Sequence, residues 1–320
     1  MKKKILAADV GGTNSRFAYF ETDLENELSL IDSLWLPTEK AYSFAQLLQQ
    51  LGDSGFPLMP ETADIAVIAV AGPVADKRRS APPYISWSID LDRAEIAERF
   101  SQVILINDFV AQAYACISPV GKKARQILPG AGEPKGQIAV LGAGTALGKA
   151  LLTLLPDGTY LALPSEGGHS YFSFCTAREF DFQRFYREKS GRYHITENLV
   201  VSGRGLRYLN WFLTGEDLAP KDVTARWSSD SETLEWAARF YGRVCRDFVL
   251  NILAEGGVFI AGGVAAKNPE IVTHHLFRQE FHDSPTMGEI LAGVPVFLLD
   301  DQNSGLWGAA FHGKQLLCLP

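Results

Sequence analysis

Two short segments of this chain have the residue types of a phosphate-binding turn. Gly11-Gly12-Thr13 follows the apolar run 5–10, and Gly142-Ala143-Gly144-Thr145 follows the apolar run 138–141. An apolar run resumes after each turn, so both segments predict a strand, a tight turn and a second strand. Backbone N–H groups and a threonine hydroxyl at such a turn can donate to phosphate oxygens. A plain hairpin is the alternative for either turn alone, but the repetition favours two domain halves that hold one polyphosphate.

Asp9 lies near the end of the first apolar run and is separated from the glycines by Val10. A carboxylate at a strand end can hold a hydrated Mg²⁺ against phosphates, although a turn-capping aspartate explains the same residue. The second turn fits neither the G-x-G-x-x-G fingerprint nor a Walker A loop, because Gly148-Lys149 is followed by Ala150 instead of serine or threonine.

A second acidic residue follows a buried strand at Asn107-Asp108. The run 103–106 is apolar, and a helical pattern begins at residue 108. Side chains at this end of a strand face the ligand crevice of α/β folds. Asp108 could therefore act as a general base that accepts a hydroxyl proton during phosphoryl transfer. A helix N-cap is an equally good explanation at this stage.

Two further glycine-rich segments have binding potential. Glu166 and His169 flank a double glycine, and their side chains could converge on neighbouring sugar hydroxyls, which both accept and donate hydrogen bonds. A structural turn explains them equally well. The strand 258–261 lies between glycine pairs that let the backbone approach a flat ligand, or that simply allow tight helix–strand packing.

The composition is that of an ordinary globular protein and excludes several classes. The chain has 320 residues, 47% of them hydrophobic, with a formal net charge of −7. The acidic balance argues against nucleic-acid or anionic-membrane binding. Neither a signal peptide nor a membrane-spanning stretch is expected, and four scattered cysteines indicate reduced thiols in the cytoplasm.

The candidate residues need an α/β scaffold. Continuous apolar runs are typical of strands buried on both faces, and we expect them at 5–10, 17–20, 65–70, 103–106, 138–141, 150–155, 258–261 and 295–299. Helical periodicity is expected at 92–100, 108–116, 176–188, 203–213 and 236–253. The fold class is therefore α/β, with a domain boundary between residues 105 and 135. The small residues after Ser304 predict a closely packed helix that returns to the first domain.

Taken together, and in their order along the chain, these motifs resemble those of bacterial glucokinases in the hexokinase–actin–chaperone ATPase superfamily. The resemblance covers nearly the whole chain and includes two further segments, Val201–Leu206 with Glu197 upstream of it, and 257–263. It implies a two-lobed ribonuclease H-like (actin/hexokinase-like ATPase) fold with an interlobe cleft. The implied lobes are a small one of residues 1–107 plus 304–320 and a large one of residues 108–303.

The same resemblance implies an ATP-dependent phosphotransferase that converts glucose to glucose 6-phosphate, in a cytoplasmic homodimer that uses Mg²⁺. Asp108 would be the catalytic base. The implied sugar-binding residues are Asn107, Glu166, His169 and Glu197. The implied nucleotide-binding residues are Asp9, Gly11, Gly12, Thr13, Asn14, Arg16, Gly142, Gly144, Thr145, Gly262 and Gly263, with Asp9 holding the Mg²⁺ through water.

Three positions depart from the family pattern. Ala146 stands where the second phosphate motif usually has glycine, which predicts strain if that position needs a positive φ. Glu197 lies one residue further from Ser202 than the family spacing. Pro83-Tyr84 replace a Thr-Asn pair in a loop that lies near the sugar, which leaves the preferred sugar open.

Two other classes of function fit parts of this pattern. A sugar-sensing regulator would be expected to carry a DNA-binding domain before the first motif, which here begins at residue 9. A chaperone-like or cytoskeletal ATPase would lack the Asn-Asp and Glu-Gly-Gly-His segments. Among enzymes, a kinase for another hexose or an amino sugar remains the nearest alternative.

Overall fold

The computed structural model describes residues 2–23 and 28–318 and divides into two compact units. Unit 1 comprises Met1–Lys123 and Asp301–Pro320, and unit 2 comprises Ala124–Asp300. The expected lobes, residues 1–107 plus 304–320 and residues 108–303, have different bounds. Residues 1, 24–27 and 319–320, which the expected small lobe includes, lie outside the described residues. The chain leaves unit 1 inside the predicted window of 105–135.

Unit 1 is built on a five-stranded sheet of order β3-β2-β1-β4-β8. Its strands are β1 (Lys3–Val10), β2 (Asn14–Thr22), β3 (Ser29–Pro37), β4 (Ile65–Val70) and β8 (Val103–Asn107). The first three strands are antiparallel, whereas β1, β4 and β8 are parallel. A smaller sheet contains β5 (Val74–Ala75), β6 (Arg79–Ser80) and β7 (Ile89–Asp90). The four predicted strands of this unit are confirmed.

Helices cover both faces of the large sheet, which explains why β1 and β4 are continuous apolar runs. One face packs with Leu47 of α1 (Phe44–Asp53) and Ile96 of α2 (Ala94–Ala97). The other face packs against α13 (Ser304–Cys318), where a Cβ placed on Gly313 would lie 3.0 Å from Ile5. Successive residues of a strand therefore face different helices.

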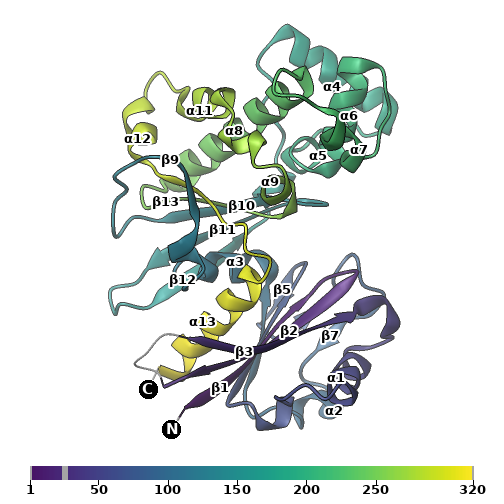
Figure 1. The fold of residues 1–320 in the computed structure, drawn as a ribbon, viewed down its shortest axis with the longest axis vertical. Helices are drawn as coiled ribbons and strands as arrows, with labels where there is room; N and C mark the ends of the chain where they lie inside the picture. Colours follow the sequence, from purple (N-terminus) through teal and green to yellow (C-terminus); the bar gives the residue numbers. More distant parts are fainter. Residues whose placement is uncertain (1, 24–27, 319–320) are drawn as a thin grey trace. The chain divides into compact units, whose positions relative to one another are not determined.

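Helix α13, yellow in Figure 1, packs along α3 (Asp108–Ala115) and against β1 and β4. A Cβ on Gly308 would lie 1.8 Å from the Ala111 carbonyl oxygen, so only glycine permits this approach. Tyr114 of α3 stacks on His312 of α13 with ring centroids 4.3 Å apart. These contacts place α3 in unit 1, whereas the expected lobes began the large lobe at residue 108. The helix expected after Ser304 is confirmed.

Unit 2 repeats the topology of unit 1 in a six-stranded sheet of order β12-β11-β10-β13-β14-β9. Its strands are β9 (Arg125–Leu128), β10 (Ile138–Ala143), β11 (Leu147–Leu154), β12 (Tyr160–Ser165), β13 (Gly257–Ala261) and β14 (Val296–Leu298). Strands β12, β11 and β10 are antiparallel, and β10, β13 and β14 are parallel, as in the corresponding strands of unit 1. Strand β9 adds an antiparallel edge.

The longest helix of unit 2 is α8 (Glu232–Ile252), whose apolar stripe was predicted and whose buried residues belong to the core of the unit. The others are α4 (Ala177–Ser190), α5 (Glu197–Val200), α6 (Gly203–Thr214), α7 (Pro220–Arg226), α9 (Gly263–Lys267), α10 (Glu270–Thr273), α11 (His275–His282) and α12 (Gly288–Gly293).

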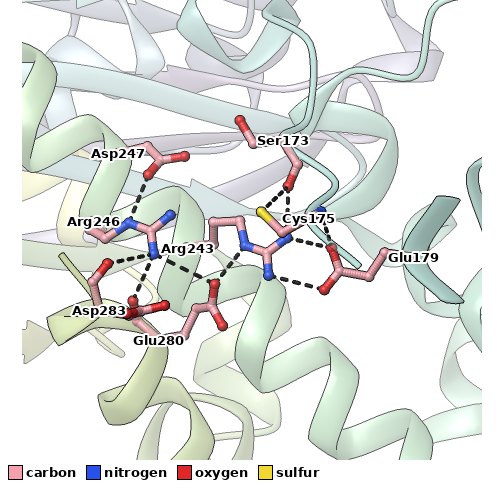
Figure 2. A network of polar contacts seen from close by, with 8 residues as sticks. All are labelled: Ser173, Cys175, Glu179, Arg243, Arg246, Asp247, Glu280 and Asp283. Carbon is pink, nitrogen blue, oxygen red and sulfur yellow. Dashed lines mark hydrogen bonds and ion pairs between the residues drawn. The ribbon is translucent and has the colours of Figure 1, made fainter. Parts of the chain in front are cut away.

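A buried network of charges joins three of these helices (Figure 2). Arg243 of α8 binds both oxygens of Glu179 on α4, at 2.7 and 3.1 Å, and its Nε donates to Glu280 of α11 at 2.6 Å. Nη1 of Arg243 also donates to the Ser173 carbonyl at 2.7 Å. Because Arg243 has two carboxylate partners, removal of one of them would leave a buried N–H donor without its hydrogen bond.

Two further expectations concern the thiols and membranes. Cys116, Cys175, Cys245 and Cys318 are all free thiols, as expected. Over residues 2–23 and 28–318, the helices are too short or too polar to cross a bilayer.

Candidate active site

The first glycine turn joins β1 to β2 as predicted. Gly11 donates from its backbone to the Asn14 carbonyl at 3.1 Å, and the Thr13 carbonyl accepts from Thr38 at 3.0 Å. The side chains of Thr13 and Asn14 are exposed. A Cβ on Gly12 would lie 2.9 Å from the Cβ of Tyr84, so the Pro83-Tyr84 loop packs directly on this turn.

Asp9 lies at the end of β1, opposite Arg16 of β2. Burial raises the pKa of the Asp9 carboxyl, and the nearby Arg16 charge opposes this rise. A Cβ on Gly305 would lie 3.4 Å from Asp9 Oδ2 and 3.4 Å from the side-chain nitrogen of Gln112. Within the described residues the carboxylate accepts no hydrogen bond, and no cluster of three metal-ligating side chains occurs. A single under-compensated carboxylate of this kind fits a hydrated Mg²⁺, which typically takes one or two protein carboxylates plus phosphates.

Arg16 is held within unit 1 by two contacts. Its guanidinium lies 4.0 Å from the centroid of the Trp35 ring, and its Nη1 donates to the Gln302 carbonyl. The guanidinium is therefore fixed beside the strand end that holds Asp9, where a positive charge would favour phosphate.

Asn107 and Asp108 lie where β8 becomes α3. The strands β1, β4 and β8 are parallel neighbours, so Asp9 and Asn107 lie at the same edge of the sheet. The N-cap of α3 is Asn107, whose Oδ1 accepts from the backbone of Phe109 at 2.9 Å and of Val110 at 3.3 Å. Its Nδ2 donates to the Gly72 carbonyl at 3.0 Å, which leaves one amide hydrogen for a ligand. The alternative explanation of Asp108 as the N-cap is therefore wrong, because its neighbour has that position.

The second glycine turn joins β10 to β11, also as predicted. Gly144 donates to the Ala146 carbonyl at 2.8 Å, and its own carbonyl accepts from Gly203 at the start of α6 at 3.0 Å. Ala146 does not have a positive φ, which among the described non-glycine residues occurs at Asp76, Lys77 and Leu253. The strain expected at Ala146 is therefore absent.

Gly142 and Gly262 hold this turn close to the end of β13. A Cβ on Gly142 would lie 2.3 Å from the Ala261 carbonyl oxygen. Gly262 has a φ of +85°, and a Cβ there would lie 2.7 Å from the Ala143 carbonyl oxygen. Nothing lies within 4 Å of a Cβ on Gly263, so the backbone is open at this point. The arrangement brings Gly142, Gly144, Thr145, Gly262 and Gly263 to one edge of the sheet of unit 2.

Glu166 and His169 lie on a 3₁₀ turn, η4 (Gly167–His169), directly after β12. Their side chains are 71% and 67% exposed, and Oε2 of Glu166 lies 3.7 Å from Nε2 of His169. A Cβ on Gly168 would lie 2.4 Å from the Leu147 carbonyl oxygen, so the turn lies against β11. The two polar side chains approach each other and are mostly exposed to solvent.

Glu197 is the first residue of α5 and, unlike Glu166, is buried. Its Oε2 forms an ion pair with the ammonium of Lys149, whose side chain is 1% exposed. Burial raises the pKa of the Glu197 carboxyl, and the charge and hydrogen bond of Lys149 oppose the rise. The next residue, Asn198, accepts from the Leu147 backbone at 2.9 Å.

Sequence reasoning did not include Lys149 or Asn198 among the candidate residues. The signal for Lys149 was a lone lysine within an apolar run, in the dipeptide Gly148-Lys149 that fails the Walker A pattern. Its partner lies 48 residues further along the chain, so no local spacing connects them.

Comparisons with known proteins find similarity along nearly the whole chain. The family model described as glucokinase matches residues 6–316. A glucokinase of Sinorhizobium fredii is 32% identical over 322 residues, which cover 97% of this chain and 92% of that protein. A glucokinase of Salmonella typhi is 32% identical over 337 residues, with 99% of each chain covered. The crystal structure of a glucokinase from an Antarctic psychrotroph superposes with a TM-score of 0.81 at 27% identity, covering 97% of this chain and 98% of that one.

Proposed function

Because the chain belongs to the glucokinase family, we propose that it transfers the terminal phosphoryl group of ATP to the 6-hydroxyl of glucose. The observation that carries this proposal is the family match over residues 6–316, which includes every candidate site residue. The α/β fold is that of the actin-like ATPases to which these kinases belong. The products are glucose 6-phosphate and ADP.

Asp108 is the general base in this proposal. Its carboxylate takes the proton of the 6-hydroxyl while the hydroxyl oxygen forms a bond to the terminal phosphorus of ATP and the bond from that phosphorus to ADP breaks. The position of Asp108 supports this role. Asn107 provides the helix cap, and Asp108 begins the helix at the carboxyl end of β8, the end of a strand at which ligands bind in α/β folds.

Four residues hold the other sugar hydroxyls in this proposal. Glu166 and Glu197 accept hydrogen bonds from hydroxyls, the remaining amide hydrogen of Asn107 donates one, and His169 can do either. The convergence of Glu166 and His169 on one turn supports a ligand with adjacent hydroxyls.

In this proposal the residues that bind the phosphates of ATP belong to the glycine turn of each unit. The proposed donors are the backbone of Gly12 and Asn14 and the hydroxyls of Thr13 and Thr145. Gly11, Gly142 and Gly144 shape their turns, since the N–H groups of Gly11 and Gly144 are already paired within them. Arg16 adds a positive charge, and the backbone at Gly262 and Gly263 contacts the adenosine. Asp9 holds Mg²⁺ through water, and the ion, when bound, neutralises phosphate charge. We also expect a homodimer in the cytoplasm, as the family resemblance implies.

The test is release of ADP with ATP and Mg²⁺ across a panel of glucose, mannose, fructose, glucosamine and N-acetylglucosamine, with a blank that lacks sugar. We expect turnover with glucose and none in the blank. Turnover with another hexose alone would contradict glucose as the substrate and direct attention to the Pro83-Tyr84 loop. Absence of sugar-dependent turnover would contradict the kinase proposal.

The same assay tests the role of Asp108 as the general base. Asp108→Asn removes the proton acceptor at nearly constant shape, so we expect kcat to fall by about 10²–10⁴-fold. Affinity for glucose, measured by calorimetry, should change little. Asp32→Asn, on the exposed edge strand β3, is the control and should keep normal turnover. Near-normal turnover of Asp108→Asn would remove Asp108 from the mechanism.

A further inference from the structure

Lys149 is a charged side chain in the interior of unit 2. It lies on β11, between β12 and β10 in the sheet, and its side chain is 1% exposed. Its Nζ binds Glu197 Oε2 and lies 4.9 Å from the centroid of the Phe248 ring on α8. Burial of two opposite charges is costly, and apolar residues often stabilise a core as well or better. The pair therefore invites an explanation other than stability.

The ammonium lies beneath the turn that bears Glu166 and His169. Lys149 is opposite Ser165 of β12 in the sheet, and Ser165 Oγ accepts from the Gly167 backbone at 3.1 Å. A Cβ built on Gly167 would lie 3.4 Å from Lys149 Cδ and 3.8 Å from its Nζ. The lysine side chain therefore lies next to this turn, where a side chain at position 167 would meet it.

The partner of Lys149 is attached to the same turn. The backbone of Glu197 donates to the Ser170 carbonyl at 3.0 Å, and Thr196 pairs with Tyr171 in a β-bridge. Strand β11, turn η4 and helix α5 therefore form one local assembly, and the Lys149–Glu197 pair lies where the three meet.

One oxygen of Glu197 remains available. Oε2 is bound to Lys149, whereas Oε1 has no hydrogen bond within the described part of the chain. Oε1 is not among the buried side-chain atoms that lack a hydrogen-bond partner in the described residues. It therefore retains contact with the surface, consistent with the 9% exposure of the Glu197 side chain. A carboxylate held by one oxygen presents the other in a fixed direction.

We propose that Lys149 is a positioning residue for the sugar, which keeps Glu197 ionised and holds its carboxylate next to the turn η4 that bears Glu166 and His169. The inference rests on the proposed function, since it takes Glu197 as a sugar ligand. An ionised carboxylate is a stronger acceptor for a sugar hydroxyl than a protonated one, so the buried ammonium contributes to affinity without touching the sugar.

The pKa of Glu197 provides a specific readout. The groups that face this carboxylate are Lys149 from β11 and Asp247 and Cys245 from α8. Burial and Asp247 raise the pKa of Glu197, and Lys149 alone among these groups lowers it. Without Lys149, Glu197 should therefore take up a proton at a higher pH than in the wild type.

The experiment compares Lys149→Met, Lys149→Arg, Glu197→Gln and the double variant Lys149→Met/Glu197→Gln. For Lys149→Met we expect the KM for glucose to rise by about tenfold or more near neutral pH, because a charged acceptor is lost. The KM should fall again as the pH rises and Glu197 ionises. The KM for ATP should stay within about twofold of the wild type, and Lys149→Arg, which keeps the charge, should restore part of the affinity.

The double variant identifies the route of the effect. If Lys149 acts through Glu197, Glu197→Gln alone raises the KM for glucose, and the KM of this variant does not fall as the pH rises. Adding Lys149→Met to Glu197→Gln then raises the KM for glucose no further. Glu280→Gln provides the matched control, since it removes a carboxylate from the arginine network of Figure 2, whose hydrogen bonds and ion pairs within the described residues include none of residues 165–169. It should lower the melting temperature and leave the KM for glucose unchanged.

Two results would overturn the inference. One is an unchanged glucose KM in Lys149→Met or in Glu197→Gln, which would make the pair purely structural. The other is an effect of Lys149→Met that adds in full to that of Glu197→Gln. If Lys149→Met does not fold, Glu197→Gln and the double variant, which has no buried charge at these positions, still decide the question. A wild type without glucose-dependent turnover would refute the proposed function itself, and the inference with it.

Discussion

Asn107 and Asp108 are both polar and adjacent in the sequence, but they have different surroundings in this protein. Asn107 uses its oxygen to cap α3 and one amide hydrogen to bind Gly72, whereas Asp108 begins the helix itself. The same contrast separates Glu166, which is exposed, from Glu197, which is buried and paired with Lys149. The chemical role proposed for each residue follows from these surroundings more than from residue type.

Glu166 allows a clean test at the residue scale, because its exposed side chain makes little contribution to stability. In Glu166→Gln an ionised acceptor becomes a neutral amide, so the KM for glucose should rise by about tenfold, while kcat falls less. Steady-state kinetics across a glucose series measures both values. The melting temperature should be unchanged, since Glu166 and His169 contact each other on the surface. An unaltered KM for glucose would exclude Glu166 from the sugar site.

Local spacing made most of the candidate residues predictable, but not the pairs between distant segments. The glycine turns and Asn107-Asp108 are visible because each motif is contiguous in the sequence. Lys149 and Glu197 meet only because β11 and α5 pack together, and a lysine in an apolar run gives no indication of its partner. The same holds for Arg243, whose carboxylate partners lie on α4 and α11.

At the scale of elements, the repeated turn proved to be part of a repeated sheet. In each unit an antiparallel hairpin is followed by two parallel strands, so β1, β2, β4 and β8 correspond to β10, β11, β13 and β14. The strands buried on both faces were predicted because they are continuous apolar runs. The edge strands β3 and β12 were not predicted, since their partly exposed residues form no such run.

The second turn offers matched glycines for a stability test. Gly142→Ala should destabilise unit 2 by about 2 kcal/mol or more, because the new Cβ would meet the backbone of Ala261 at 2.3 Å. Gly144→Ala should cost much less, since the nearest atom to its Cβ lies at 4.0 Å and its φ is not positive. Ala146→Gly should cost less than about 1 kcal/mol, mainly through entropy. Urea denaturation measures the free energy of unfolding of all three variants.

Equal stabilities of Gly142→Ala and Gly144→Ala would contradict the close approach of β10 and β13. A large gain in activity in Ala146→Gly would show that the alanine does strain the turn. Such a gain is not expected, because Ala146 has an ordinary φ in the described structure.

At the scale of the whole molecule, segments from both ends of the described chain belong to the same unit. Helix α13 comes from the C-terminal segment but packs on β1, β4 and α3, which is why unit 1 includes Asp301–Pro320. The return of this helix was predictable from its small residues, because Gly308 allows contact with the α3 backbone. The inclusion of α3 in unit 1 was not predictable, since nothing in its own sequence identifies the helix it packs against.

The packing of α13 on α3 predicts acid sensitivity of the fold. His312 is buried against Tyr114, and its Nδ1 has no hydrogen-bond partner. Burial, with a smaller effect of Lys77, lowers the pKa of His312 from 6.5 to about 4. Between these two values the unfolded chain binds a proton that the folded chain does not, so stability falls as the pH decreases. The loss amounts to at most about 3 kcal/mol at pH 4.

His312→Leu removes this titrating group and should reduce the loss of stability between pH 6.5 and pH 4. Free energies of unfolding in urea at a series of pH values provide the measurement. His282, which is also partly buried and has a lowered pKa, contributes a loss of the same sign, so His312→Leu reduces the slope without removing it, and His312→Leu/His282→Leu should reduce it further. Parallel stability curves for the wild type and His312→Leu would show that His312 takes up its proton equally in the folded and unfolded chains, and that its burial against Tyr114 does not oppose charging.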